Sequence, residues 1–277
     1  MNIQTALLQG VKLLEDGAIG VPRLTAEVLL VHALGRERSY LYAHPEEPLS
    51  EVAWLHFGRY LHERLKGKPT QYITGRQEFY GREFRVTPAV LIPRPETELV
   101  VETALAIGPG ARRIVDAGCG SGAIAVTLQL ETGALVAGTD ISAAALAVAA
   151  ENGRRLGARA AWVQCDLISA FAAASVDMIV SNPPYVPLGD RAGLQREVRD
   201  YEPEVALFAG PTGFEIYERL AADAARVLRP GGWLVLELGY TSKDRVTAML
   251  GAHWRDMRVV PDLAGIPRVL AGRMLRE

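Results

Sequence analysis

The second half of the chain alternates between short apolar runs and longer segments with helical spacing of apolar residues. Five runs have the length and composition of buried strands: residues 112–118, 134–140, 161–166, 178–182 and 233–238. Segments with helical character occupy residues 123–130, 141–156 and 214–228. Because this alternation is typical of parallel sheets covered by helices on both faces, we predict an α/β fold. Two more runs, residues 258–261 and 268–275, are expected to form an antiparallel pair.

The first 75 residues differ, because their apolar residues recur only at helical spacing. Three stripes show this spacing: Leu7, Leu8, Val11 and Leu14; Val28, Val31, His32 and Leu34; Trp54, Phe57, Leu61 and Leu65. Segments rich in turn-forming residues separate the stripes. We therefore predict a small bundle of three to five helices over residues 1–75.

Residues 76–95 carry isolated aromatic residues among glycines and prolines, which is typical of a hairpin or an extended linker. Pro93 and Pro95 fix their own φ angles and keep the residues before them out of the helical region. Acidic residues favour the first turn of a helix, so we expect a helix to begin near Glu96. The predicted α/β domain then covers residues 96–277.

Composition and charge exclude several classes of protein. The chain has 277 residues, of which 49% are hydrophobic and 22% are charged, as in ordinary globular proteins. Its 30 Lys and Arg against 32 Asp and Glu argue against binding nucleic acid through phosphate contacts. Cys119 and Cys165 cannot form a disulfide framework or a four-cysteine metal site. Without a signal peptide or a long apolar stretch, we expect a soluble, cytoplasmic, metal-free protein.

A glycine-rich turn follows the first predicted strand. Its sequence is Asp116-Ala117-Gly118-Cys119-Gly120-Ser121-Gly122. Glycines let the backbone turn sharply and let a ligand approach closely, and the next helix directs its N-terminus at the same place. The spacing differs from the Gly-x-Gly-x-x-Gly pattern of dinucleotide-binding turns. We expect these residues to bind a cofactor, with Asp116 near a cationic amino-acid portion. A purely structural turn is the alternative.

Acidic residues also end the second and third predicted strands. Asp140 is placed to accept hydrogen bonds from both hydroxyls of a ribose, or alternatively to cap the following helix, for which Ser142 is a second candidate. Asp166 is placed to accept a hydrogen bond from an adenine amine, and Leu167 to cover the ring. A plain turn between strand and helix is the alternative for these two residues.

The sequence Asn182-Pro183-Pro184-Tyr185 follows the fourth predicted strand. Asn182 and Pro183 each precede a proline, so both backbones are confined to extended conformations. Oδ1 of Asn182 and the carbonyl oxygen of Pro183 therefore point in fixed directions, which suits a planar NH2 group with two hydrogens to donate. Tyr185 adds an aromatic face for the same group. We predict that these four residues bind an amide or an exocyclic amine.

A site for a planar amine, a ribose-binding acid and a glycine turn without the dinucleotide spacing together imply S-adenosylmethionine and methyl transfer to nitrogen. Residues 116–122, Asp140, Asp166 and the Asn-Pro-Pro-Tyr sequence resemble the class I S-adenosylmethionine-dependent methyltransferases. That resemblance implies a Rossmann-like sheet. The Asn-Pro-Pro-Tyr sequence is shared by adenine-N6 and glutamine-N5 enzymes, so it leaves both reactions open.

The segment before the α/β domain favours one of these reactions. Residues 68–75, 79–81 and 90–98 resemble the peptide chain release factor glutamine methyltransferases, and Glu237 also fits that family. The resemblance covers almost the whole chain. Related enzymes that act on a ribosomal protein typically carry Ser-Pro where this chain has Pro95-Glu96. Members of the family can carry an aromatic residue in place of Leu167.

The resemblance implies methylation of the side-chain nitrogen of the glutamine in the Gly-Gly-Gln motif of bacterial class I release factors. Asn182, Pro183 and Tyr185 are then the catalytic residues, and residues 1–75 recognise the protein substrate. The alternatives are a glutamine of a ribosomal protein and adenine-N6 methylation of nucleic acid. We expect a monomer that binds release factors but neither membranes nor nucleic acid directly.

Overall fold

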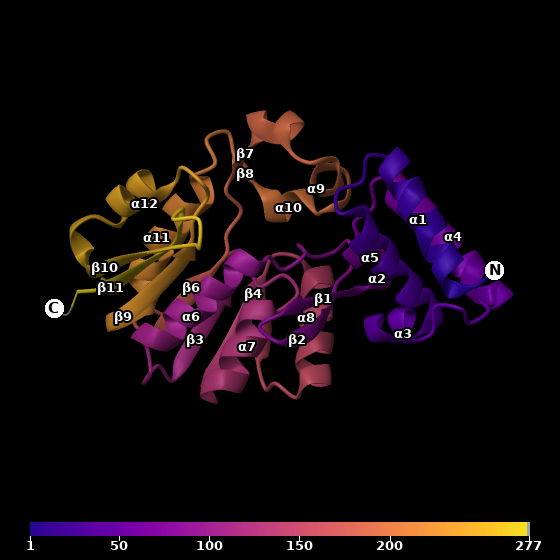
Figure 1. Cartoon of the computed structure of the whole chain (residues 1–277). Helices are drawn as coiled ribbons and strands as arrows, with labels where there is room; N and C mark the ends of the chain where they lie inside the picture. Colours follow the sequence, from indigo (N-terminus) through magenta and orange to yellow (C-terminus); the bar gives the residue numbers. More distant parts are fainter. Residues whose placement is uncertain (276–277) are drawn as a thin grey trace. The chain divides into compact units, whose positions relative to one another are not determined.

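The computed structural model describes residues 1–275 and comprises two compact units. The first unit contains residues 1–76 and 195–201, and the second contains residues 77–194 and those from 202 onward. The chain therefore passes from one unit to the other at residues 76–77, 194–195 and 201–202. Figure 1 colours the chain along its sequence and labels the elements of both units.

The first unit is helical. Its helices are α1 (Ile3–Asp16), α2 (Pro22–Leu34), α3 (Arg38–Ala43), α4 (Glu51–Leu65), α5 (Thr70–Thr74) and α9 (Arg196–Tyr201). Ile3, Leu14, Leu30 and Phe57 are fully buried among them. The prediction of three to five short helices in the first 75 residues is confirmed by α1 to α5.

Two of the three predicted apolar stripes are correct only in part, because Leu8 of the first stripe is exposed and the stripe on α2 contributes only Val31 and Leu34 to the edge of the core. The buried side chains of α2 are Ala26, Glu27, Leu29 and Leu30, whereas Val28, Val31, His32 and Leu34 are only half-buried. Burial of the Glu27 carboxylate is compensated by hydrogen bonds from Arg23, Arg38 and Tyr42. The spacing of apolar residues cannot reveal this buried charge, because two of its three partners, Arg38 and Tyr42, come from the next helix, α3.

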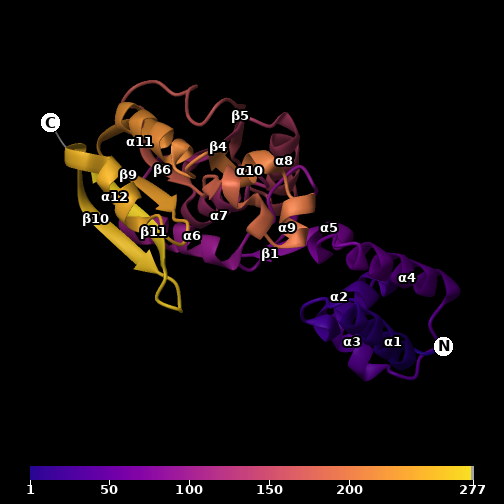
Figure 2. The same cartoon turned by 90° about the horizontal axis from the view of Figure 1, so that it is seen from above.

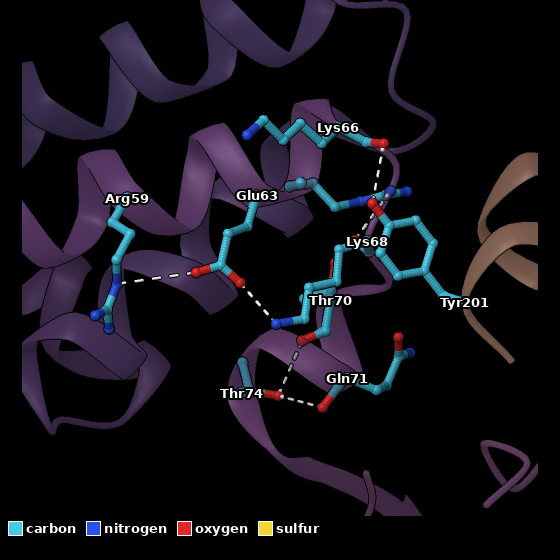
Figure 3. A network of polar contacts seen from close by, with 9 residues as sticks. Arg59, Glu63, Lys66, Lys68, Thr70, Gln71, Thr74 and Tyr201 are labelled. Carbon is cyan, nitrogen blue, oxygen red and sulfur yellow. Dashed lines mark hydrogen bonds and ion pairs between the residues drawn. The ribbon is translucent and has the colours of Figure 1, made fainter. Parts of the chain in front are cut away.

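Helix α9 packs in the helical unit, although it follows the fourth predicted strand in the sequence. Glu197 forms an ion pair with Arg64 at 2.6 Å. The Tyr201 hydroxyl donates a hydrogen bond to the carbonyl oxygen of Lys66 at 3.2 Å, and Figure 3 shows this contact just after the end of α4. No pattern in the sequence predicted α9, because its stabilising contacts come from residues more than a hundred positions away.

A seven-stranded sheet organises the second unit within the described chain (Figures 1 and 2). The strand order is β10-β11-β9-β6-β3-β4-β5. The strands are β3 (Arg113–Ala117), β4 (Leu135–Asp140), β5 (Ala161–Gln164), β6 (Val176–Ser181), β9 (Leu228–Glu237), β10 (Trp254–Pro261) and β11 (Pro267–Met274). β3 to β6 and β9 are parallel, and β11 pairs antiparallel with β9 and β10. The predicted α/β fold and the antiparallel pair are confirmed.

Helices cover both faces of this sheet. They are α6 (Glu98–Ile107), α7 (Ala123–Thr132), α8 (Ala143–Leu156), α11 (Glu215–Val227) and α12 (Lys243–Leu250). Val115 and Ile179 belong to the core cluster under α11 and α12, whereas their neighbours Ile114 and Met178 belong to the cluster under α6 and α7. This division follows from the alternation of side chains along each strand.

Several predicted boundaries differ from the structure. β9 begins at Leu228 rather than at residue 233, and the strand predicted over residues 161–166 ends at Gln164. Pro230, Gly231 and Gly232 suggest a turn, but the register between β6 and β9 shifts there, as at a bulge, and the strand continues through them. The helix expected to begin near Glu96 starts as η1 (Pro95–Thr97) and continues as α6. Besides α9, the unpredicted elements are β7 (Val186–Pro187), η2 (Leu188–Gly193), α10 (Glu204–Leu207), β8 (Phe208–Gly210), α12 and η3 (Gly251–His253).

Apart from Arg76, which belongs to the first unit, the predicted hairpin is part of the second unit. It consists of β1 (Arg76–Phe79) and β2 (Arg82–Arg85), joined by Tyr80 at φ +52° and Gly81 at φ +70°. Phe79 and Phe84 pack edge to face with ring centroids 6.0 Å apart. Both rings are fully buried in the core that also holds α6 and α7. The hairpin therefore contributes to the core of the sheet unit.

Candidate active site

A cavity of about 300 Å³ lies at the carboxyl ends of the parallel strands in the second unit. Ligands of open α/β sheets bind at this edge. The predicted site residues that line the cavity are Gly118, Cys119, Ser121, Asp140, Asp166, Leu167, Asn182 and Pro184. Asp116, Gly120, Gly122, Pro183 and Tyr185 are not among its lining residues. The structure thus brings the ends of four predicted strands to one cavity.

The glycine turn follows β3 and leads directly into α7. Gly118, Gly120 and Gly122 have φ angles of +72°, +52° and +79°, in the left-handed region that favours glycine. A Cβ at Gly122 would lie 2.9 Å from the Trp162 ring, so this position also requires glycine for packing. The backbone N–H of Gly120 donates a hydrogen bond to Oδ2 of Asp140 at 3.0 Å. This bond ties the turn to the end of the neighbouring strand.

Asp116 is fully buried beneath the turn. Its Oδ2 accepts a hydrogen bond from the backbone N–H of Ala125 at 3.0 Å, in the first turn of α7. Its Oδ1 has no hydrogen-bond partner among the described residues. Burial raises the pKa of Asp116 to about 7, and the charge of Asp140 adds to this effect. A buried carboxylate that is only half satisfied is a favourable neighbour for a cationic ligand.

Asp140 lines the cavity at the end of β4 and does not cap α8. Ser142 is the N-cap residue of that helix, because its Oγ accepts a hydrogen bond from the N–H of Ala145 at 3.2 Å. Oδ1 of Asp140 accepts a hydrogen bond from the N–H of Ser142 at 2.9 Å, and Oδ2 binds the glycine turn. The two backbone bonds fix the plane of the Asp140 carboxylate at the cavity wall.

Asp166 and Leu167 line the cavity after β5. Asp166 forms an ion pair with Arg219 of α11, which also lines the cavity and which the sequence did not indicate. Leu167 has a φ of +49°, an unusual value for a bulky side chain. Its carbonyl oxygen accepts a hydrogen bond from Oγ1 of the buried Thr139 at 2.7 Å, which holds the turn in this conformation.

Asn182 lies where β6 ends, and its amide is oriented by a hydrogen bond. Nδ2 of Asn182 donates to Oγ1 of Thr97 at 3.1 Å. Oγ1 of Thr97 in turn donates to Oε2 of Glu237 at 2.6 Å. Burial raises the pKa of Glu237 to about 7. Thr97 and Glu237 fall within stretches that resemble the family, but nothing in their spacing along the chain indicated that they contact each other.

Tyr185 is half-buried and follows Pro184, which lines the cavity. Its ring packs against Gly239, where a Cβ would lie 3.0 Å from Cδ2 of Tyr185. Burial raises the pKa of the Tyr185 phenol to about 12. The phenol therefore stays protonated at neutral pH.

Two protein families match this chain, and each match falls within one of the two units. Residues 5–75 match the PrmC N-terminal domain, and residues 96–194 match the methyltransferase small domain. The release factor glutamine methyltransferase of Koribacter versatilis is 44% identical over 277 residues, which cover 99% of each chain. The chain belongs to the release factor glutamine methyltransferases. This membership confirms the resemblance and the expected class of enzyme.

Solved structures share the fold of these methyltransferases at low sequence identity. A methyltransferase from Pyrococcus furiosus is 16% identical, with a TM-score of 0.54 over 72% of this chain and 91% of that one. A 16S rRNA methyltransferase of T. thermophilus, in complex with AdoMet and guanosine, is 22% identical, with a TM-score of 0.53 over 72% and 49% of the two chains. Both confirm the predicted Rossmann-like sheet.

Two features are absent from residues 1–275. No group of His, Cys, Asp and Glu in this part of the chain is arranged to hold a metal ion. None of its helices is both long and apolar enough to cross a membrane.

Proposed function

We propose that this protein transfers the methyl group of S-adenosylmethionine to the side-chain amide nitrogen of the glutamine in the Gly-Gly-Gln motif of class I release factors. The observation that carries the proposal is one cavity lined both by the glycine turn with Asp140 and by an Asn182 amide held in one orientation. Membership in the release factor glutamine methyltransferases supports the same reaction.

The residues on the glycine-turn side fit the cofactor. Asp140, held by two backbone N–H groups, binds the ribose hydroxyls, and Asp166 with Leu167 binds the adenine. The unpartnered Oδ1 of Asp116 supplies negative charge close to the amino-acid portion. When bound, S-adenosylmethionine supplies an electrophilic methyl group on a sulfonium ion.

The residues after β6 hold the amide that accepts the methyl group. Oδ1 of Asn182 and the carbonyl oxygen of Pro183 accept the two hydrogens of the glutamine NH2, and the Tyr185 ring packs against its plane. An amide nitrogen is a weak nucleophile because its lone pair is delocalised into the carbonyl group. Fixing both hydrogens orients the nitrogen for attack, and such positioning contributes up to about 7–11 kcal/mol in model reactions.

The same two acceptors stabilise the transition state. Positive charge develops on the amide nitrogen as it takes the methyl group, so its hydrogen bonds to Asn182 and Pro183 strengthen. The amide then loses one hydrogen as a proton to solvent. The helical unit, which contains residues 1–76 and α9, recognises the protein substrate.

Methyl transfer from radiolabelled S-adenosylmethionine to a purified release factor tests this function. The matched control is the same release factor with Gln→Ala in its Gly-Gly-Gln motif, and we expect label in the parent factor only. Ribosomal proteins and adenine-containing DNA serve as competing acceptors in parallel reactions. Equal labelling of the Gln→Ala factor, or labelling of DNA alone, would refute the proposed function.

A further inference from the structure

Three side chains form a continuous set of hydrogen bonds, and two of them, Asn182 and Thr97, line the cavity. Asn182 donates through Nδ2 to Oγ1 of Thr97, and Thr97 donates through Oγ1 to Oε2 of Glu237. Thr97 is 5% exposed and Glu237 is 3% exposed, so water does not compete effectively for these bonds. The residues come from the end of β6, from η1 and from the end of β9.

The direction of each bond depends on the next one. A hydroxyl has a single hydrogen, so Thr97 accepts from Asn182 while it donates to Glu237, and a Glu237 carboxylate enforces this direction because it can only accept. With its NH2 end bound to Thr97, Asn182 has Oδ1 left for the cavity that it lines. A protonated Glu237 has a hydrogen to donate as well as an oxygen that accepts, so it also permits the reverse direction, in which Glu237 donates to Thr97 and the Thr97 hydrogen turns to Oδ1 of Asn182.

We propose that Thr97 and Glu237 are positioning residues that keep Asn182 with its oxygen towards the substrate, and that Glu237 enforces this orientation as a carboxylate. The inference rests on the proposed function, because it treats Oδ1 of Asn182 as an acceptor for the substrate amide. It goes further by making that acceptor depend on the protonation of a side chain two hydrogen bonds away.

Groups from several elements act on the Glu237 carboxyl. Burial raises its pKa to about 7, and the hydrogen bond from Thr97 opposes this rise. The positive charges of Arg268 and Arg94 also lower the pKa of Glu237, whereas the charge of Glu96 raises it. The Tyr185 phenol lies within electrostatic range of Glu237 and is uncharged at neutral pH because its pKa is about 12. Physiological pH therefore spans both protonation states of Glu237.

The backbone around Glu237 is held independently of this carboxyl. The Tyr217 hydroxyl donates a hydrogen bond to the backbone carbonyl oxygen of Glu237 at 2.8 Å, and the Tyr217 side chain is fully buried. A change of protonation at Glu237 therefore changes the hydrogen bonds of Thr97 and Asn182 without requiring β9 to move. We expect methyl transfer to be fast above pH about 7 and to slow as Glu237 gains a proton below it.

The first test compares variants in single-turnover methylation of a release factor at saturating cofactor. Thr97→Val should slow transfer about ten- to a hundredfold, because Asn182 is then free to rotate, and Thr97→Ser should restore most of the rate. Thr127→Val is the matched control, because the buried Thr127 hydroxyl has no partner among the described residues. Calorimetry with S-adenosylmethionine should give similar affinities for all four proteins and verifies that each is folded.

The pH profile separates positioning from mere structural support. Glu237→Gln cannot titrate, so its single-turnover rate should stay flat where the rate of the parent protein falls below pH about 7. At saturating cofactor, the titration of Asp116 does not affect the measured rate, because Asp116 acts on the affinity for the cofactor. An unaltered acid limb in Glu237→Gln, or a Thr97→Val rate within about twofold of the parent, overturns the inference.

A second measurement needs no methylation substrate. The side-chain amide signals of Asn182 in a ¹H–¹⁵N spectrum, identified by their loss in Asn182→Asp, should shift with a midpoint near pH 7 in the parent protein. They should not shift in Glu237→Gln. A parent protein that shows this titration but fails to methylate any release factor contradicts the proposed function and retains the orientation mechanism. Absence of the titration in the parent rules out the orientation mechanism.

Discussion

The glycine-turn side and the Asn182 side of the cavity use different chemistry, although both lie at the carboxyl ends of strands in one sheet. On the glycine-turn side, Asp116 and Asp140 are carboxylates whose partners are backbone N–H groups. On the Asn182 side, a neutral amide is bound to a hydroxyl, which is bound to a carboxyl. The first side therefore offers fixed negative charge, and the second offers an oriented acceptor.

This difference matches the two reactants of the proposed methyl transfer. S-adenosylmethionine carries positive charge and hydroxyl groups, which carboxylates bind through charge and hydrogen bonds. The glutamine amide is neutral and gains charge only during the reaction, so an oriented acceptor has most effect in the transition state. Changes on the glycine-turn side should therefore alter cofactor affinity, and changes on the Asn182 side should alter the rate.

The largest effect is expected for Asn182→Ala. Loss of the acceptor frees the substrate amide to rotate and removes a bond that strengthens in the transition state, so the rate should fall at least about a hundredfold. Cofactor affinity should change by less than about threefold, as measured by calorimetry. The matched control is Tyr185→Phe, which keeps the ring and should retain most of the rate. An Asn182→Ala protein with more than about a tenth of the parent rate would show that the acceptor is not needed.

Asp140→Ala should produce the opposite pattern. A hydrogen bond to a charged group is worth about 1.5–3 kcal/mol, so cofactor affinity should fall about ten- to a hundredfold. Ser142 still caps α8, so the fold should be retained. The rate at saturating cofactor should remain near that of the parent protein. Unchanged affinity in a folded Asp140→Ala protein would show that Asp140 does not bind the ribose.

Asp116 should make cofactor affinity depend on pH. Because burial raises the pKa of Asp116 to about 7, the carboxylate that favours a cation is lost as the pH falls through 7. Affinity for S-adenosylmethionine should be up to about tenfold weaker at pH 6 than at pH 8. Asp116→Asn keeps an acceptor for the Ala125 N–H and should show no such dependence. A pH profile shared by both proteins would place the titrating group elsewhere.

The smallest effect is expected for Arg219→Ala. Arg219 and Asp166 form a half-exposed ion pair, and such pairs contribute about 0–1 kcal/mol. Removing Arg219 leaves the Asp166 carboxylate free for the adenine amine, so affinity for S-adenosylmethionine should rise by at most about fivefold. Arg226→Ala on the same helix is the control. A tenfold loss of affinity in Arg219→Ala, but not in the control, would mean that Arg219 itself binds the cofactor.

Local sequence was sufficient to predict the structure at positions where a residue's own covalent structure limits its backbone conformation. The three glycines of the turn adopt positive φ angles, and the sequence predicted a sharp turn at that point. Parallel strands place their carboxyl ends at one edge, so the residues that follow β3, β4, β5 and β6 could be expected at one cavity. The sequence alone does not decide between Asp140 and Ser142 as the cap of α8, because both residue types cap helices about equally well.

The sequence by itself determined the alternating fold, the glycine turn and the rigid Asn-Pro-Pro-Tyr segment, because these depend on residue type and close spacing along the chain. Only the tertiary structure decided that Asp116 is buried with one oxygen that has no partner among the described residues. It also decided that Asn182 donates a hydrogen bond to Thr97, which donates one to Glu237. Thr97 and Glu237 are 140 positions apart, and their contact arises from the packing of η1 against the end of β9. Burial and hydrogen-bond direction depend on which elements pack together, and no local pattern specifies that.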